Sequence, residues 1–206
     1  MSWAAVTARL GVVAGLGLIL TALSELAFYP VDLAPGALPD LAVMVLAYGL
    51  CGWLAWGMVG GRDGAAATWV MGGAVGFLAE GVVVPQLYAE LPLSLVWTPL
   101  AWHAAVSVAA GLAGLGWALA RGAAAAALAA GLLGVAVGLW SAWMWRVVEA
   151  PDGTQTFADA DPWRLALQMT AAGMMLVAGH AIWRAGAPRP RPSRWDVALP
   201  GALFLL

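Results

Sequence analysis

Three ionisable residues, Glu25, Glu80 and His103, lie within hydrophobic runs that are long enough to cross a lipid bilayer. A charged group at that depth costs several kcal/mol, so such residues usually face a bundle interior, a partner or water. Carboxylates and imidazoles exchange protons, ligate metal ions and act as general acids and bases. These three residues therefore mark the region of the chain where we expect a functional site.

Glu80 and His103 are expected at the same depth on neighbouring helices. Glu80 precedes Tyr88, where its apolar run meets the outer surface, and His103 follows Trp97, where the next run re-enters. At 1.5 Å of rise per residue, both side chains lie roughly 9–12 Å below that surface. The short connection predicts antiparallel neighbours, with Glu25 at a shallower position near the end of the first helix.

Other polar and aromatic residues of the same outer half are candidates for a ligand pocket around this pair. Trp140 and Trp143 share one helix face, because they are three residues apart. We expect the pocket, bounded by the first, third and fourth helices, to include Glu25, Tyr48, Trp102, Trp140, Trp143 and Gln168.

Four interpretations of Glu80 and His103 remain open. The pair can serve the structure alone, by hydrogen-bonding each other or backbone carbonyls that Pro85 and Pro99 leave without donors. It can also take part in proton or ion coupling, ligate a metal with Glu25, or act as a catalytic acid–base pair. No HxxxH, HExxH or DxxD pattern supports a metal, so the metal remains unknown. A shared bis-histidine haem is not expected, because His180 lies at a different depth from His103, and the sequence identifies no cofactor.

The composition excludes a water-soluble protein. The 206 residues are 63% hydrophobic and 10% charged, and the mean hydropathy is +0.87, whereas soluble domains carry about 25% charged residues. A net charge of −2 without a basic block makes nucleic acid an unexpected partner. The single cysteine, Cys51, cannot form an internal disulfide. Basic residues are all Arg, and this composition, rich also in Ala and Gly, indicates a GC-rich coding genome.

The sequence predicts an all-α integral membrane protein, a single domain over 1–206 built as a bundle of six transmembrane helices with short loops. A span needs about 20 mostly apolar residues. Six segments qualify: 7–29, 38–60, 66–88, 96–120, 123–147 and 164–184. The loop from Glu149 to Asp161 is polar, and the apolar tail 195–206 is too short to span by itself.

The arginines predict the orientation, because cytoplasmic loops carry an excess of basic residues. If the six helices alternate, seven arginines fall on one side: Arg9, Arg62, Arg121, Arg184, Arg189, Arg191 and Arg194. Only Arg146 and Arg164 fall near the other side. We therefore expect both termini in the cytoplasm and the protein in a prokaryotic cytoplasmic (inner) membrane.

Three functions fit these observations. The first is a multi-pass membrane protein that binds or translocates a small ion or ligand through an outer-half pocket. The second is an integral-membrane enzyme that uses Glu80 and His103, with or without a metal, on a lipid or isoprenoid. The third is an accessory subunit that binds other membrane proteins. Loops this short exclude a soluble catalytic domain, and the sequence does not decide whether the protein is an enzyme.

Overall fold

The structure is a computed structural model that describes residues 3–31, 34–149, 154–157, 161–185, 193 and 198. Helices dominate the described chain, and several of them continue directly into a neighbouring helical segment. The bounds, in chain order, are α1 (Trp3–Thr21), η1 (Ala22–Leu26), η2 (Pro35–Ala37), α2 (Leu38–Met58), α3 (Ala65–Leu78), η3 (Ala79–Val83), η4 (Pro85–Tyr88), α4 (Leu93–Val96), η5 (Trp97–Gly114), α5 (Leu115–Arg121), α6 (Ala123–Met144) and α7 (Pro162–Ala185).

These segments form six continuous helices that are long and apolar enough to cross a bilayer. The six predicted spans are thereby confirmed as helices, and the protein is a helical bundle with the properties of a multi-pass membrane protein. The helices extend over Trp3–Leu26, Pro35–Met58, Ala65–Val83, Leu93–Arg121, Ala123–Met144 and Pro162–Ala185.

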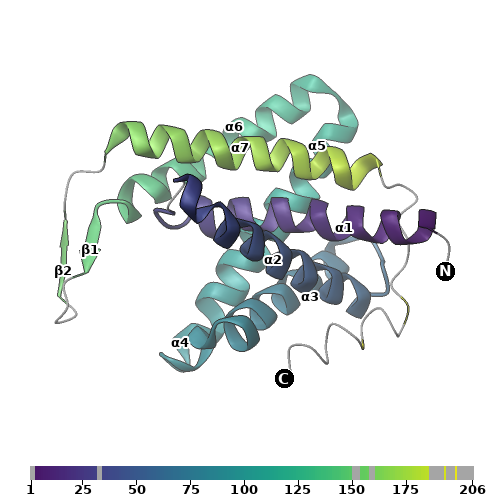
Figure 1. The fold of residues 1–206 in the computed structure, drawn as a ribbon, viewed down its shortest axis with the longest axis horizontal. Coiled ribbons are helices and arrows are strands. Elements are labelled where there is room, and N and C mark those ends of the chain that lie inside the picture. The colour runs from purple at the N-terminus through teal and green to yellow at the C-terminus, as the bar shows by residue number, and fades with distance from the viewer. Residues whose placement is uncertain are drawn as a thin grey trace.

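The first helix lies at the centre of the bundle. Its residues Leu16, Ile19 and Leu20 are completely buried, and α1 packs against α2, α7 and η5. By contrast, α6 lies at the periphery, where only Val137 and Ser141 of its residues are buried. The start of α1 and the end of α7 lie at the same end of the bundle (Figure 1); we call this the N-terminal end and the opposite end the hairpin end.

The hairpin end takes its name from two short strands that the sequence analysis did not predict. Strands β1 (Val147–Glu149) and β2 (Gln155–Phe157) pair antiparallel, with Val147 opposite Phe157. They occupy the connection between α6 and α7, where a polar loop was expected. The bundle is therefore all-α apart from this hairpin. The tail 195–206 lies outside the described residues except for Ala198.

Helix ends differ from the prediction by a few residues, and proline accounts for the largest difference. The third helix was predicted to reach Tyr88, but it ends at Val83. Pro85 has no amide hydrogen and disfavours a helical conformation in the residue before it. The chain turns into a 3₁₀ segment there, η4, which contains Tyr88.

Small residues allow α3 and η5 to touch along their backbones. A Cβ atom added to Gly72 would lie 2.5 Å from the Cα of Ala104, and one added to Gly76 would overlap the backbone of Pro99. Close approach through glycine is common between membrane helices, because packing replaces the hydrophobic effect there. This contact fixes the position of Glu80, one turn beyond Gly76, relative to His103.

We predict that Gly72→Ala destabilises the protein, whereas Gly138→Ala does not. The added methyl group at position 72 has no space, and overpacking of this kind typically costs about 1–3 kcal/mol in the free energy of unfolding. A Cβ added to Gly138 of α6 meets nothing within 4 Å. Thermal unfolding of both variants in the same detergent, followed by circular dichroism, compares them. Equal midpoints would contradict the close contact between α3 and η5.

Candidate functional site

Glu25, Glu80 and His103, three ionisable residues that the sequence places within apolar runs, all lie on π-helical segments. Glu25 and Ser24 belong to η1, Glu80 to η3, and His103 to η5. The wider turn is visible in backbone bonds that span five residues, from the Ala27 amide to the Ala22 carbonyl and from the Val84 amide to the Ala79 carbonyl. Such insertions are uncommon in α-helices and are frequent at functional sites.

His103 connects a carboxylate to two buried hydroxyl groups. Its Nε2 atom lies 3.0 Å from Glu80 Oε1, and its Nδ1 atom lies 3.0 Å from Ser24 Oγ. The Ser24 hydroxyl lies 3.0 Å from Ser107 Oγ. His103 is 2% exposed, Ser24 4% and Ser107 0%. The imidazole therefore has partners on both nitrogen atoms, as a polar group buried in an apolar bundle requires.

The charge of Glu80 determines the direction of these hydrogen bonds. An ionised carboxylate only accepts, so a neutral His103 donates its proton from Nε2 to Glu80 and leaves Nδ1 as an acceptor. Nδ1 then accepts from the Ser24 hydroxyl, whose oxygen accepts from Ser107. All four groups are satisfied in this arrangement without a charge on the imidazole.

The second carboxylate, Glu25, is held by a tyrosine from α2. The Tyr48 hydroxyl donates to Glu25 Oε1 at 2.6 Å. The Tyr48 ring lies 5.9 Å from the His103 ring, centroid to centroid. The two pairs, Glu80 with His103 and Glu25 with Tyr48, are therefore adjacent.

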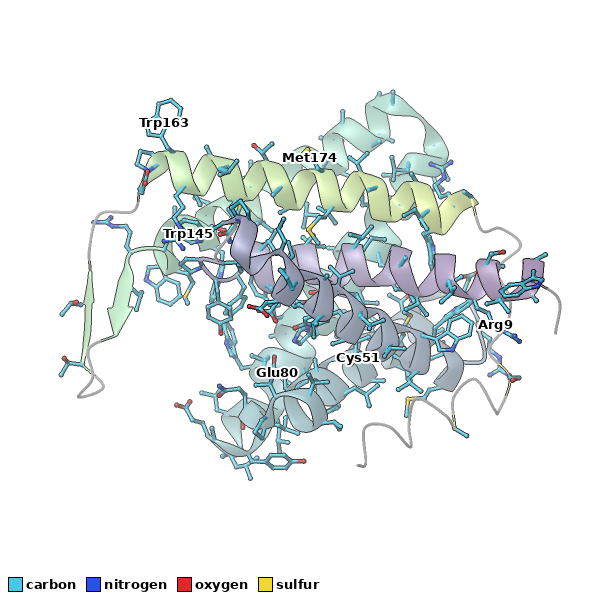
Figure 2. All side chains as sticks on the ribbon, in the orientation of Figure 1. Arg9, Cys51, Glu80, Trp145, Trp163 and Met174 are labelled. Carbon is cyan, nitrogen blue, oxygen red and sulfur yellow. The ribbon has the colours of Figure 1, made fainter. Side chains whose placement is uncertain are left out.

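Both carboxylates line a cavity of about 670 Å³ at the hairpin end. The other polar residues that line it are Tyr29, Asp40, Tyr48, Cys51, Gln86, Glu90, Ser94 and Thr98. Val43, Met44, Val83 and Val84 contribute to an apolar wall. Figure 2 shows Glu80 and Cys51, two of the lining residues, on adjacent helices within the bundle. The volume suits a small organic molecule.

The charge of the cavity is entirely negative among its described lining residues. Four carboxylates line it, those of Glu25, Asp40, Glu80 and Glu90, and no Arg, Lys or His does so. Tyr29 also lines the cavity. Partial burial raises the pKa of its phenol, and the negative charges of Glu80 and Glu25 raise this pKa further. Tyr29 is therefore a neutral aromatic group at neutral pH.

The predicted tryptophans form a separate aromatic cluster. Trp102 packs edge-on against Phe28 at 4.3 Å between centroids, Trp140 lies 4.9 Å from Trp102, and Trp143 lies 5.1 Å from Trp140. The Trp102 indole also donates to the Leu23 carbonyl at 2.9 Å. None of the three tryptophans lines the cavity. They join η1, η5 and α6 rather than surround a ligand.

Gln168 also lies away from the cavity, where it caps the first helix. Its side-chain amide donates to the carbonyls of Leu26 and Tyr29, and its oxygen accepts from the Val31 amide. The last carbonyls of a helix lack partners within that helix. Gln168 supplies partners from α7, so its role in the structure is to hold the chain that leaves η1.

Sequence reasoning missed two kinds of site residue. Ser24 and Ser107 are short polar residues that membrane helices tolerate, and their only signals were adjacency to Glu25 and a spacing of four from His103. Asp40 and Glu90 were not among the candidate pocket residues, although both line the cavity. The prediction included Tyr48 but did not name the second helix as a wall of the pocket, and α2 also contributes Cys51 and several apolar residues.

Ser24, His103 and Glu80 are hydrogen-bonded in the same order as the nucleophile, base and acid of a hydrolase triad. They differ from a triad because a substrate in the cavity does not reach Ser24. A nucleophile must reach the substrate and must have its proton taken by the base. Ser24 is 4% exposed, is bonded to Ser107 as well as His103, and is not part of the cavity lining. The arrangement is a hydrogen-bonded chain leading inward from Glu80, and the cavity side of it is the carboxylate.

The described residues contain no group of three or more His, Cys, Asp or Glu side chains arranged to hold a metal ion. His180, the second intramembrane histidine, lies apart from His103, and its Nε2 donates to the Gly111 carbonyl at 3.0 Å. Compared with known proteins, the chain matches no family model, no curated protein and no solved structure.

We predict that a neutral His103 carries its proton on Nε2 when Glu80 is ionised, because the carboxylate can only accept. Nitrogen-15 NMR of histidine-labelled protein can test this, since the chain has two histidines and His180→Gln assigns both. Glu80→Gln should change the His103 nitrogen shifts, and Glu90→Gln, which removes a cavity carboxylate near the mouth, should not. A neutral imidazole of His103 with its proton on Nδ1 in the parent protein would contradict the hydrogen-bond directions.

Proposed function

We propose that this protein binds a small amphipathic organic cation in the cavity at the hairpin end. The observation that carries this proposal is the charge of the lining: four carboxylates without a basic residue among the described lining residues. A cleft of one sign with apolar walls concentrates ligands of the opposite sign. The proposal refines the expectation of a pocket for a small ion or ligand.

The walls favour an organic cation over a metal ion. Val43, Met44 and Val83 offer apolar contacts that a hydrated metal ion cannot use. Tyr29, Tyr48 and Trp97 also line the cavity, and aromatic faces attract organic cations by about 0.5–2 kcal/mol each. A molecule with an apolar body and one positive centre would use both kinds of wall.

Proton exchange follows from the same carboxylates. A proton and a cation each neutralise Glu25 or Glu80, so the two compete for the site. The repulsion between two neighbouring carboxylates in a poorly screened cavity is relieved by either ligand. Binding of the cation should therefore release protons, which is the coupling that a proton-exchanging carrier needs. Translocation is part of this proposal, and the reconstituted protein should exchange protons for the cation across a vesicle membrane.

We predict that tetraphenylphosphonium binds the purified protein and that tetraphenylborate, an anion of similar size and shape, does not. Isothermal titration of the full chain in a neutral detergent measures both. Glu25→Gln and Glu80→Gln should each weaken tetraphenylphosphonium binding at least tenfold, about 1.4 kcal/mol, because they remove a buried charge next to the ligand. Affinity should fall as the pH is lowered, and protons released on binding should appear as a dependence of the measured heat on the buffer.

Two controls accompany this titration. Asp161→Asn removes an exposed carboxylate that lies outside the cavity lining, and it should leave the affinity within about twofold of the parent value. Circular dichroism and gel filtration verify that each variant is folded. Equal binding of the two tetraphenyl ions, or unchanged affinity in both glutamate variants, would disprove the cation site.

We further propose that the protein lies in a prokaryotic inner membrane with its N-terminal end in the cytoplasm, on the basis of the arginine distribution. In a Cys51→Ala background, Asp63→Cys and Gln155→Cys place single thiols at opposite ends of the bundle. A membrane-impermeant maleimide should label position 155 in intact cells and position 63 only after permeabilisation. Labelling of both positions in intact cells, or the reverse pattern, would contradict this orientation.

A further inference from the structure

A second cavity, of about 600 Å³, lies at the N-terminal end of the bundle. The first turn of α3 and the end of α7 form its mouth, with Arg62, Gly64 and Arg184 among the lining residues. The floor is apolar and aromatic, and includes Trp56, Val108, Leu112 and Trp183. It therefore combines a charged mouth with an apolar interior, at the opposite end of the molecule from the cavity lined by Glu25, Asp40, Glu80 and Glu90, which we call the acidic cavity.

Its charge is opposite to that of the acidic cavity. Arg62 and Arg184 line it, and Asp63 is the only acidic residue among its described lining. Within the described part of the chain, neither arginine forms a salt bridge with a carboxylate. A third guanidinium, that of Arg121, lies 3.4 Å from the ring centroid of Trp117, and Trp117 is itself a lining residue.

The backbone adds to the positive character of the mouth. The chain between α2 and α3 turns through Gly60, Gly61 and Gly64, all with positive φ, and it enters α3 at Ala65. The first amides of a helix have no partners within that helix and carry partial positive charge. Gly64 and Ala65 both line the cavity, so these amides are close to the two arginines. No side chain at Gly64 obstructs the mouth.

We propose that this cavity is a binding site for the headgroup of an anionic phospholipid. Guanidinium groups bind phosphate with paired hydrogen bonds, and basic pockets between membrane helices are a recurring setting for acidic lipid headgroups. The apolar floor would accept the glycerol backbone and the first methylene groups of the acyl chains, which a free phosphate ion would leave empty. Exposed Trp69 and Trp117 beside the mouth place it at the depth of the membrane interface.

The test compares ligands and matched variants. Delipidated full-length protein in a neutral detergent is titrated with short-chain phosphatidylglycerol, short-chain phosphatidylcholine and inorganic phosphate, and binding is followed by native mass spectrometry and by the thermal midpoint. We expect phosphatidylglycerol to bind at least tenfold more tightly than the other two. Equal binding of phosphatidylcholine would overturn the role of negative charge, and equal binding of inorganic phosphate would assign the site to a free anion.

Arg62→Gln with Arg184→Gln should weaken phosphatidylglycerol binding at least tenfold. The matched control is Arg146→Gln with Arg164→Gln, which removes the same charge from the hairpin end and should change the affinity less than twofold. Equal losses in the two double variants would overturn the site, because they would indicate attraction by total charge alone.

If the glutamine double variant does not fold, Arg62→Lys with Arg184→Lys replaces it. Lysine keeps the charge but loses the paired hydrogen bonds, so we expect a threefold to tenfold loss of phosphatidylglycerol affinity, and an unchanged affinity would overturn the proposal. Tetraphenylphosphonium binding at the acidic cavity should be unaffected in these variants, so this site and the cation site can fail separately.

Discussion

The buried bond between Glu80 and His103 constrains the rest of the bundle. A carboxylate and an imidazole inside apolar helices are stable only if every donor and acceptor finds a partner, because an unpaired buried polar group costs about 1–3 kcal/mol and a charged group costs more. Partners on three different helices must therefore meet within about 3 Å. The glycine contact between α3 and η5 and the π-helical turns of η1, η3 and η5 are the means by which the backbone achieves this geometry.

The wider turns change the directions in which three helices point their side chains toward His103. A π-helical turn inserts one residue and rotates the following side chains around the helix axis. In η1 it directs Ser24 to His103 while Glu25 reaches Tyr48. Two adjacent residues of one helix thus serve the two hydrogen-bonded pairs.

The sequence predicts the depth of a residue along its helix, but it does not predict the direction in which the side chain points around the helix axis. Depth along a helix follows from counting residues to the membrane interface, so the six helices and the meeting of Glu80 with His103 could be predicted. Rotation about the helix axis could not, because these helices are apolar on all sides and carry no amphipathic signal. For example, Trp140 and Trp143 lie at the predicted depth but belong to the aromatic cluster and not to the cavity. Gln168 lies at the predicted depth too, but its side chain contacts the end of η1. The hairpin was missed because three-residue strands have almost no periodic pattern.

The chain from Glu80 through His103 to the two serines also links the cavity to the core. With Glu80 ionised, the hydrogen bonds run from Ser107 through Ser24 and His103 toward the carboxylate. A proton on Glu80 makes it a donor to Nε2, which moves the imidazole proton to Nδ1 and reverses both serine hydroxyls. In the reversed direction Ser107 accepts from Ser24, and no group among the described residues accepts the Ser107 hydrogen, so the two directions are not equivalent. A cation that replaces the proton at Glu80 would therefore change the hydrogen-bond direction as far as Ser107, which is completely buried beside the central helix.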